Sequence, residues 1–367
     1  MPRIAGVAAA FPPHSYPQAE ITELLGPIIT NDASKRLLLN RLHQNSKVAS
    51  RHLVMPYEWY RDSSLNFTLT NNIFIGAAVD LAEEAVVSAL AKASLQATDI
   101  DYVIFTSVTG ISAPSVDALL ALRLGFRSDV KRVPMFGLGC VAGAAGIARA
   151  NDYLLGHPND VALLISVELC SLTVQRGDDS MGNLVASGLF GDGAAAVLMV
   201  GSDRAETMAV TGPDVLDSRS RLYPGTEAVL GFNPGESGFR IVLTAGVADV
   251  IDEHFDDDVV GFLTEHDLAV ADIDVWMAHP GGPRVLESFS SALGLPQGAL
   301  DVSWQSMAAK GNMSSASILH VLAETLSLER FDEGGLGLLF ALGPGVCAEI
   351  VLLKWPESQA QEQQTSD

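Results

Sequence analysis

Apolar residues follow two patterns that alternate along the first half of the chain. Runs that are apolar at nearly every position predict buried strands at residues 3–10, Tyr102–Ser107, Val133–Phe136, Val161–Val167 and Gly193–Val200. Between these runs, apolar residues recur every three or four positions, which predicts helices over Ile75–Ala93 and Ser115–Leu124 and short helices with a loop within residues 17–50. Strands that alternate with helices predict an α/β fold whose sheet is covered on both faces.

The second half of the chain repeats this plan. Three pairs of segments match in the same order: Asp99–Thr106 with Asp272–His279, Gly139-Cys140 with Gly311-Asn312, and Phe190–Ala196 with Leu342–Ala348. Matches in a shared order indicate an internal duplication. We therefore predict two halves, residues 1–205 and 206–356, packed about a pseudo-twofold axis. The polar residues 357–367 are predicted to be a disordered tail.

Composition narrows the class of protein. Of the 367 residues, 48% are hydrophobic, which indicates extensive buried structure, and the net charge of -22 argues against nucleic acid as the main partner. The three cysteines lack the paired spacing of a disulfide framework or a zinc site. The most apolar stretch, Leu336–Leu353, is broken by Gly343-Pro344-Gly345 and predicts two strands, so we expect no integral membrane segment. No signal peptide is recognisable, and a cytoplasmic protein is expected.

One segment departs from the acidic balance. Between Lys35 and Arg51 lie five basic side chains and no acidic one. A basic helix face that balances an acidic neighbour accounts for this pattern. A docking patch for a phosphorylated small molecule, such as a nucleotide or coenzyme A, accounts for it equally well.

The candidate nucleophile is Cys140, which lies on a glycine-rich turn between a predicted strand and a predicted helix. The N-terminus of a helix has unpaired N–H groups and a positive dipole end, and both favour a thiolate. The alternative is a buried cysteine with only a structural role. The duplication favours the first interpretation, because the pseudo-twofold axis brings Asn312 and the strand that ends at His279 to the same central site.

Cysteine, histidine and asparagine at one apolar site indicate acyl-thioester chemistry. A thiolate–imidazolium pair of Cys140 and His279 could accept an acyl group, while His279 and Asn312 donate hydrogen bonds to a thioester oxygen. The same donors would stabilise the enolate that forms when a malonyl group loses carbon dioxide. This chemistry needs no metal or redox cofactor. The simpler alternatives are a histidine that caps a turn and an asparagine that serves as an N-cap.

At these residues the chain resembles the type III polyketide synthases of the chalcone synthase superfamily, which have the layered αβαβα thiolase fold. The resemblance runs from about residue 3 to Trp355 and is carried by these motifs: Gly139-Cys140, Phe190-Gly191-Asp192-Gly193, His279-Pro280-Gly281-Gly282-Pro283, Gly311-Asn312-Met313-Ser314-Ser315 and Gly343-Pro344-Gly345. It implies that Cys140 is the nucleophile and that His279 and Asn312 act in decarboxylation. It also implies acyl-CoA and malonyl-CoA substrates and a homodimer in which the segment around Ile111 lies near the partner's cavity.

The resemblance further implies the walls of the substrate cavity, with Phe190 as a gatekeeper. The other cavity residues it implies are Thr106, Cys170, Thr173, Ile241, Ser314, Gly343, Pro344 and Gly345. Coenzyme A would contact Arg41, Lys47, Arg51, Gly281, Gly282 and Arg284. Ile241 stands where plant flavonoid enzymes have a phenylalanine, which implies a wider or differently shaped cavity.

Glu168–Thr173 together with Gly238–Leu243 is similar to bacterial alkylresorcinol and alkylpyrone synthases. This similarity implies a long-chain fatty acyl starter, extended iteratively by malonyl-CoA or methylmalonyl-CoA and then cyclised. Two alternatives remain open from the residues. One is a β-ketoacyl carrier-protein synthase of the initiating type, which condenses once. The other is a catalytically silent acyl-CoA binder on the same fold.

Overall fold

The computed structural model describes residues 1–328 and 333–357. Within this part of the chain, nine strands form one sheet in the order β11-β12-β13-β8-β1-β7-β6-β4-β5. The strands of the first half are β1 (Arg3–Ala10), β4 (Tyr102–Thr106), β5 (Lys131–Met135), β6 (Val161–Leu169) and β7 (Asp192–Val200). Those of the second half are β8 (Asp214–Leu222), β11 (Val275–Ala278), β12 (Leu336–Gly343) and β13 (Cys347–Lys354). The predicted tail falls, beyond residue 357, outside the described residues.

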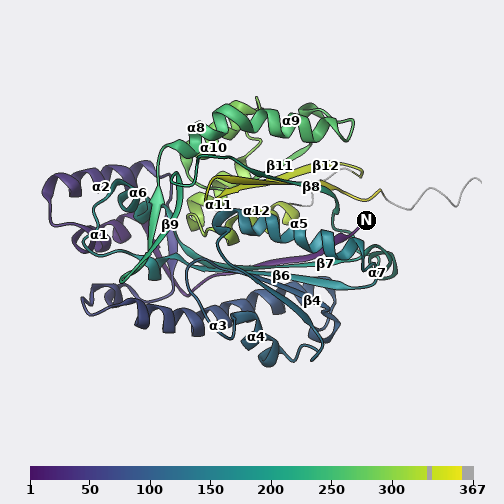
Figure 1. Ribbon diagram of the computed structural model, residues 1–367, viewed down its shortest axis with the longest axis horizontal. Helices are drawn as coiled ribbons and strands as arrows, with labels where there is room; N and C mark the ends of the chain where they lie inside the picture. Colours follow the sequence, from purple (N-terminus) through teal and green to yellow (C-terminus); the bar gives the residue numbers. More distant parts are fainter. Residues whose placement is uncertain (329–332, 358–367) are drawn as a thin grey trace, which may run out of the picture.

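Five layers are visible in Figure 1, and they confirm the predicted αβαβα arrangement. Helices α5 (Ala142–Leu155) and α12 (Ser315–Ser327) lie between the two halves of the sheet. The outer face of the first half is covered by α3 (Phe67–Ala93) and α4 (Val116–Leu124). The outer face of the second half is covered by α8 (Gly246–Val250), α9 (Asp256–Thr264) and α10 (Pro283–Ala292). Each half of the sheet is thus shielded from water on both faces, as its apolar strands require.

Strand pairing shows the duplication directly. The order β4-β6-β7-β1 in the first half corresponds to β11-β12-β13-β8 in the second. In both sets the first pair is parallel and the next two pairs are antiparallel. The two sets meet where β1 pairs with β8 through Arg3 and Asp214. The matched segments found in the sequence therefore occupy equivalent places in the two halves.

Small residues let the two central helices approach closely. A Cβ added at Gly143 of α5 would lie 2.3 Å from the carbonyl oxygen of Ser315 and 2.6 Å from Ile318 Cγ2 of α12. A Cβ at Gly146 would lie 2.4 Å from Leu164 Cδ1 of β6. Both contacts are shorter than packed atoms allow. Gly143 therefore lets the starts of α5 and α12 approach each other, and Gly146 lets α5 approach β6. Cys140 and Asn312 lie two and three residues before the starts of α5 and α12.

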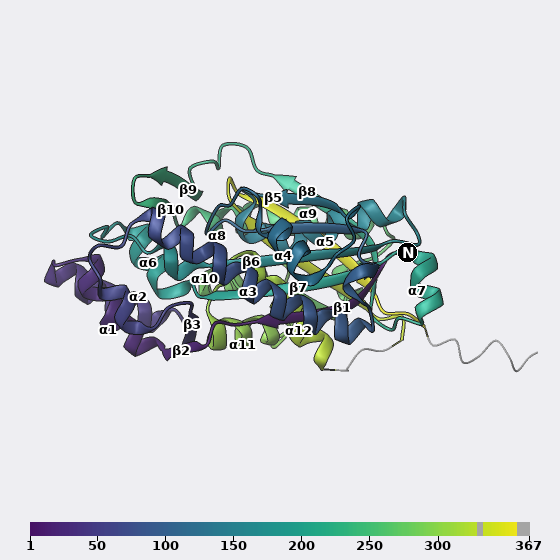
Figure 2. The same cartoon turned by 90° about the horizontal axis from the view of Figure 1, so that it is seen from below.

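A separate group of elements closes one end of the sheet, seen at the left of Figure 1 and again in Figure 2. It contains β2 (His14–Pro17), α1 (Gln18–Ile29), α2 (Ala33–Asn45), β3 (Ser50–Leu53), α6 (Met181–Leu189), β9 (Leu230–Gly235) and β10 (Gly238–Leu243). The short helices predicted within residues 17–50 are confirmed. The remaining helices are α7 (Ser202–Met208) and α11 (Asp301–Lys310).

Two predicted elements begin more than one residue away from their observed start. Helix α3 begins at Phe67, before the predicted Ile75, because the side chain of Asn66 caps its N-terminus by accepting from the Leu69 N–H at 3.1 Å. Most residues of these first turns are partly exposed, so they lack the apolar periodicity on which the prediction rested. Strand β5 likewise begins at Lys131 and has exposed side chains along most of its length, which is typical of an edge strand. Across the described part of the chain, no helix has the length and apolar content needed to cross a membrane.

Candidate active site

Cys140 lies on a tight 3₁₀ turn, Gly139–Val141, that leads into α5. Gly139 has a φ of +53°, and a Cβ there would lie 2.7 Å from Cδ and Cγ of Pro344. In the other direction, a Cβ at Gly343 would lie 2.5 Å from the carbonyl oxygen of Leu138. The turn that carries Cys140 and the Gly343-Pro344 turn of the second half are therefore in direct contact, and both need glycine for this approach.

Asn312 is held by a short strand-like pairing with Phe190. Its backbone N–H donates to the carbonyl of Leu189 at 2.8 Å, and its carbonyl accepts from the N–H of Gly191 at 2.9 Å. The side chain is fixed as well, because Oδ1 accepts from the Ser314 N–H at 2.8 Å and Nδ2 donates to the Gly281 carbonyl at 3.2 Å. Within the described residues, the Asn312 amide nitrogen thus donates to Gly281, and the amide side chain also hydrogen-bonds the Cys140 thiol, so it lies beside the sulfur.

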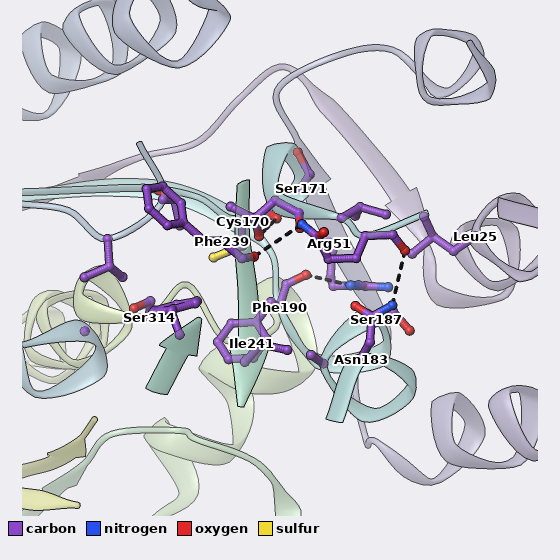
Figure 3. Close-up of a pocket in the computed structure, with 18 of the residues that line it drawn as sticks. Leu25, Arg51, Cys170, Ser171, Asn183, Ser187, Phe190, Phe239, Ile241 and Ser314 are labelled. Atoms are coloured by element: carbon purple, nitrogen blue, oxygen red, sulfur yellow. Dashed lines mark hydrogen bonds between the residues drawn. The ribbon is translucent and has the colours of Figure 1, made fainter. Parts of the chain in front are cut away.

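Ser314 connects Asn312 to the cysteine. It precedes α12 with φ 47° and ψ -127°, an unusual backbone conformation for a residue other than glycine. The Cys140 thiol donates to the Ser314 hydroxyl at 3.7 Å. Figure 3 shows Ser314 on the wall of the cavity. The predicted convergence of the Cys140 and Asn312 segments is therefore observed.

His279 follows β11 and continues its pairing, since its N–H donates to the carbonyl of Phe340 at 2.9 Å. The side chain is buried, and within the described residues neither ring nitrogen has a hydrogen-bond partner. Its loop is linked to Asn312, because Asn312 Nδ2 donates to the carbonyl of Gly281. An imidazole without protein partners can direct its N–H to a bound substrate.

Burial opposes charge on both candidate reacting groups. It raises the pKa of the Cys140 thiol to about 12, although hydrogen bonds with Ser314 and Asn312 act in the opposite direction. Burial also lowers the pKa of His279 to about 3. Burial therefore favours the neutral form of each group, and a thiolate–imidazolium pair would form by passage of the proton from the sulfur to the imidazole.

A cavity of about 950 Å³, partly open to solvent, begins at Cys140. Six of the nine cavity residues that the family resemblance implied line it: Cys170, Thr173, Phe190, Ile241, Ser314 and Pro344. Figure 3 labels Phe190, Ile241, Cys170 and Phe239 among the residues that line it. The described residues that line it do not include His279 or Asn312, both of which are buried.

Three implied cavity residues occupy other places. Thr106 is buried at the end of β4, and Val108 and Thr109, farther along the chain, line the cavity instead. The reason is that Thr106 still belongs to the sheet, paired with Met135 on one side and Ser166 on the other. Gly343 and Gly345 flank Pro344 and shape the turn without lining the cavity.

Sequence reasoning missed a large part of the cavity wall. Helix α1 supplies Ile21, Leu24 and Leu25, and α6 supplies Asn183, Ala186 and Ser187. The spacing of Ile21, Leu24 and Leu25 indicates an apolar helix face. That spacing does not tell whether the face covers protein or a cavity.

Of the six implied coenzyme A contacts, Arg51 differs from the other five in its surroundings. Arg41, Lys47 and Arg284 are exposed, and Gly281 and Gly282 lie just after His279. Arg51 does not fit a phosphate contact at the surface, because its side chain is 2% exposed within β3 and lines the cavity. In an alternating strand its side chain points inward toward Phe190, whereas Arg41 lies on the exposed face of α2.

Glu168, near the end of β6, is also buried. Its carboxylate accepts hydrogen bonds from the Thr109 hydroxyl at 3.0 Å, the Val108 N–H at 3.1 Å and the Ser315 hydroxyl at 2.5 Å. Burial raises the pKa of this carboxyl above its usual value. Through these hydrogen bonds, the Glu168 carboxylate connects Ser315 at the start of α12 with Val108 and Thr109, which line the cavity.

This site on this fold defines the class of protein. Residues 3–204 match the N-terminal domain and residues 214–355 the C-terminal domain of the chalcone and stilbene synthases, and the chain belongs to this family. It is a type III polyketide synthase, an acyltransferase that condenses acyl thioesters with decarboxylation.

Individual relatives are also similar over nearly the whole chain. A 1,3,6,8-tetrahydroxynaphthalene synthase of Streptomyces peucetius subsp. caesius is 51% identical over 352 residues, covering 96% of this chain and 93% of the relative. The alpha-pyrone synthesis polyketide synthase-like Pks18 of Mycobacterium tuberculosis is 30% identical over 358 residues, covering 95% of this chain and 90% of the relative. The crystal structure of the 1,3,6,8-tetrahydroxynaphthalene synthase of Streptomyces coelicolor A3(2) superposes with a TM-score of 0.90 at 32% identity, covering 97% of this chain and 100% of that chain.

Proposed function

We propose that this enzyme assembles a poly-β-keto chain from malonyl-CoA alone and cyclises it to a tetrahydroxynaphthalene. The observation that carries this proposal is the polar part of the cavity wall. Hydroxyl and amide groups lie among the apolar side chains: Thr109, Ser171, Thr173, Gln175, Asn183 and Ser187. These groups already have hydrogen-bond partners within the protein. A poly-β-keto chain has an oxygen on every second carbon and can add hydrogen bonds to them, whereas an alkyl chain cannot.

The relatives support the same product. The 51% identity to a tetrahydroxynaphthalene synthase extends over nearly all of both chains. The naphthalene skeleton has ten carbons, and each malonyl group contributes two after losing carbon dioxide. Malonyl units alone can therefore supply the whole skeleton.

In the proposed mechanism, Cys140 takes up the starter. As its sulfur attacks the thioester carbonyl, the proton passes to His279 and then to the departing coenzyme A thiolate. This route agrees with the burial of both groups, because a charged pair forms only while the reaction proceeds. The product of this step is an acyl group on Cys140 and free coenzyme A.

His279 and Asn312 are the proposed donors for the extension step. The bond between the malonyl α-carbon and its carboxylate breaks, carbon dioxide leaves, and the electron pair becomes an enolate. The N–H of the Asn312 amide that does not donate to Gly281 and the N–H of His279 hydrogen-bond the enolate oxygen. The α-carbon then attacks the thioester carbonyl on Cys140, the new carbon–carbon bond forms, and the sulfur is released for the next round.

A second candidate is the starter implied from the sequence, a long-chain fatty acyl group extended by malonyl-CoA or methylmalonyl-CoA to an alkylpyrone or alkylresorcinol. Its support is the apolar side of the cavity, formed by Ile21, Leu24 and Leu25 of α1 together with Leu53 and Val174. The 30% identity to an alpha-pyrone synthesis enzyme also favours it. An alkyl chain buried against this side would gain roughly 0.8 kcal/mol per CH₂ group.

One incubation separates the two candidates. Purified enzyme receives malonyl-CoA alone or malonyl-CoA with lauroyl-CoA, and products are identified by mass spectrometry beside a Cys140→Ala control. A tetrahydroxynaphthalene from malonyl-CoA alone, undiminished by equimolar lauroyl-CoA, supports the first proposal. Alkylated pyrones or resorcinols as the main products, with little turnover of malonyl-CoA alone, would replace it with the second.

Coenzyme A is proposed to bind with its phosphates at Arg41 and Lys47 on α2 and just after it, and with its pantetheine along Gly281, Gly282 and Arg284. Arg41 and Lys47 are exposed, and Arg284 is paired with Asp249 at 3.4 Å, an exposed contact that a phosphate can replace. The charge reversals Arg41→Glu and Lys47→Glu are expected to raise KM for malonyl-CoA and leave kcat unchanged. An unchanged KM would exclude this placement.

A homodimer is proposed from the edge strand β5. Its face carries Val133, followed by Phe136, which is 61% exposed, and the nearby loop carries Ile111, which is 48% exposed. Exposed apolar side chains at a sheet edge favour association. Light scattering during gel filtration is expected to give twice the monomer mass, and Phe136→Asp to shift it toward the monomer. A wild-type protein that elutes as a monomer at micromolar concentration would refute the dimer.

A further inference from the structure

Arg51 is a buried cation at the active site, and its nitrogens donate to a side-chain amide and to a backbone carbonyl. Its Nε donates to Gln18 Oε1 at 3.0 Å and its Nη1 donates to the carbonyl of Phe190 at 2.6 Å. Among the described residues, Nη2 has no hydrogen-bond partner and Arg51 takes part in no ion pair within 4.0 Å. Figure 3 shows its side chain beside Phe190, and the hydrogen bond between them is drawn.

The aliphatic part of Arg51 packs against two glycines of the site. A Cβ at Gly311 would lie 2.9 Å from Arg51 Cδ and 3.0 Å from its Cγ, and a Cβ at Gly191 would lie 3.5 Å from its Cβ. Gly311 immediately precedes Asn312, and Gly191 immediately follows Phe190. Arg51 thus covers both segments that form the short pairing around Asn312.

That pairing sets the position of the Asn312 amide. The Asn312 N–H donates to the carbonyl of Leu189, and the Gly191 N–H donates to the carbonyl of Asn312. The segment Leu189–Gly191 begins at the last residue of α6, and the Arg51 guanidinium holds it through the Phe190 carbonyl. A shift of Phe190 would therefore be transmitted to Asn312 through these two backbone hydrogen bonds.

An apolar side chain of similar volume would fill the same space at lower cost. Burying a charged group is unfavourable unless a nearby opposite charge and hydrogen bonds compensate for the lost hydration. Burial lowers the pKa of Arg51 to about 10, and the attraction of the Asp192 carboxylate opposes part of this decrease. The guanidinium therefore stays protonated at neutral pH. The charge is therefore best explained by the hydrogen bond it makes to the backbone of the site.

We propose that Arg51 is a positioning residue for decarboxylation: it holds the Phe190 carbonyl and, through the pairing of Leu189–Gly191 with Asn312, aims the Asn312 amide at the malonyl thioester. This inference rests on the proposed role of Asn312. It assigns Arg51 to the extension step and not to the binding of coenzyme A. Acyl transfer to Cys140 does not require Asn312 to be aimed in this way.

The test separates two partial reactions. Intact-protein mass spectrometry measures acylation of Cys140 by hexanoyl-CoA, and chromatography measures decarboxylation of malonyl-CoA to acetyl-CoA. Arg51→Met is expected to keep acylation at one group per chain and to slow decarboxylation by roughly 10- to 100-fold, the effect of misplacing a catalytic group by about 1 Å. Arg51→Lys, which can still reach the Phe190 carbonyl with its ammonium group, is expected to recover part of the rate. Arg204→Met, on α7 and paired with Asp99, serves as the matched control.

A double-mutant cycle distinguishes positioning from a general loss of structure. In an Asn312→Ala background, Arg51→Met is expected to lower decarboxylation no further, because Arg51 acts through Asn312. Equal losses in both backgrounds, or proportional losses of acylation and decarboxylation, would overturn the inference. Full decarboxylation by Arg51→Met would overturn it as well. If Asn312→Ala itself retained full decarboxylation, the proposed function of Asn312 would fail first, and that result is recognisable independently.

Discussion

The contact between the turn of Cys140 and Pro344 can be tested by placing a methyl group between them. In a Gly139→Ala variant the added Cβ would lie 2.7 Å from Cδ and Cγ of Pro344, about 1 Å closer than carbon atoms normally pack. Overpacking of this kind costs about 1–3 kcal/mol. The φ of +53° adds about 1–2 kcal/mol, because alanine tolerates the left-handed region poorly.

The expected loss of unfolding free energy is therefore about 2–5 kcal/mol, a large part of the roughly 5–15 kcal/mol of a typical domain. The matched control is Gly125→Ala. Gly125 has a φ of +72° and nothing within 4 Å of its added Cβ, so this variant is subject to the conformational cost alone. The difference between the two variants isolates the overlap with Pro344.

Activity adds a second measurement. Relief of the overlap moves the turn by a fraction of an ångström to about 1 Å, which is expected to lower kcat with malonyl-CoA by roughly 100-fold. Urea unfolding and release of coenzyme A measure the two effects. If Gly139→Ala were no less stable than Gly125→Ala and kept more than half of its activity, the two turns would not constrain each other, and the reasoning would be wrong.

Three further predictions concern charge and packing. In a His279→Gln variant, Cys140 is expected to keep its raised pKa. Iodoacetamide at pH 7 should therefore alkylate Cys140 at least ~100-fold more slowly than it alkylates free cysteine, and the alkylation rate should rise steadily up to pH 10. A rate that reaches a plateau below pH 8 would contradict this prediction. Burial raises the pKa of Asp192 from 3.8 to about 6, so the folded protein binds its proton more tightly and stability should fall as the pH rises from 4 to 6, by at most about 3 kcal/mol. In an Asp192→Asn variant, urea unfolding at several pH values should show that the unfolding free energy changes less between pH 4 and pH 6. If the pH dependence were unchanged, Asp192 would not be its cause. In a Gly143→Ala variant the added Cβ would lie 2.3 Å from the carbonyl oxygen of Ser315 and should force α5 and α12 apart. The thermal midpoint should fall far more than in the control Gly261→Ala, whose added Cβ has nothing within 4 Å. Equal midpoints for the two variants would refute the close packing of these helices.

The local sequence determined much of the fold and the reacting groups. Strands such as Val161–Leu169 are apolar at nearly every position because both of their faces are covered, and this pattern is visible without a structure. The glycines on each side of Cys140 and the repeated motif that ends at His279 are local as well. The duplication could therefore be predicted, and with it the convergence of the Cys140 and Asn312 segments that the structure contains.

Only the tertiary structure decided which side chains reach the cavity. Arg41 and Arg51 lie in one basic segment and look alike in the sequence, yet one is exposed on α2 and the other is buried against Phe190. Helix α1, far from Cys140 along the chain, supplies Leu25 to the cavity wall. Burial and cavity shape depend on contacts between distant segments, and a side chain's direction depends on how its element is docked. Local pattern determines which elements form, and packing between them determines what each side chain touches.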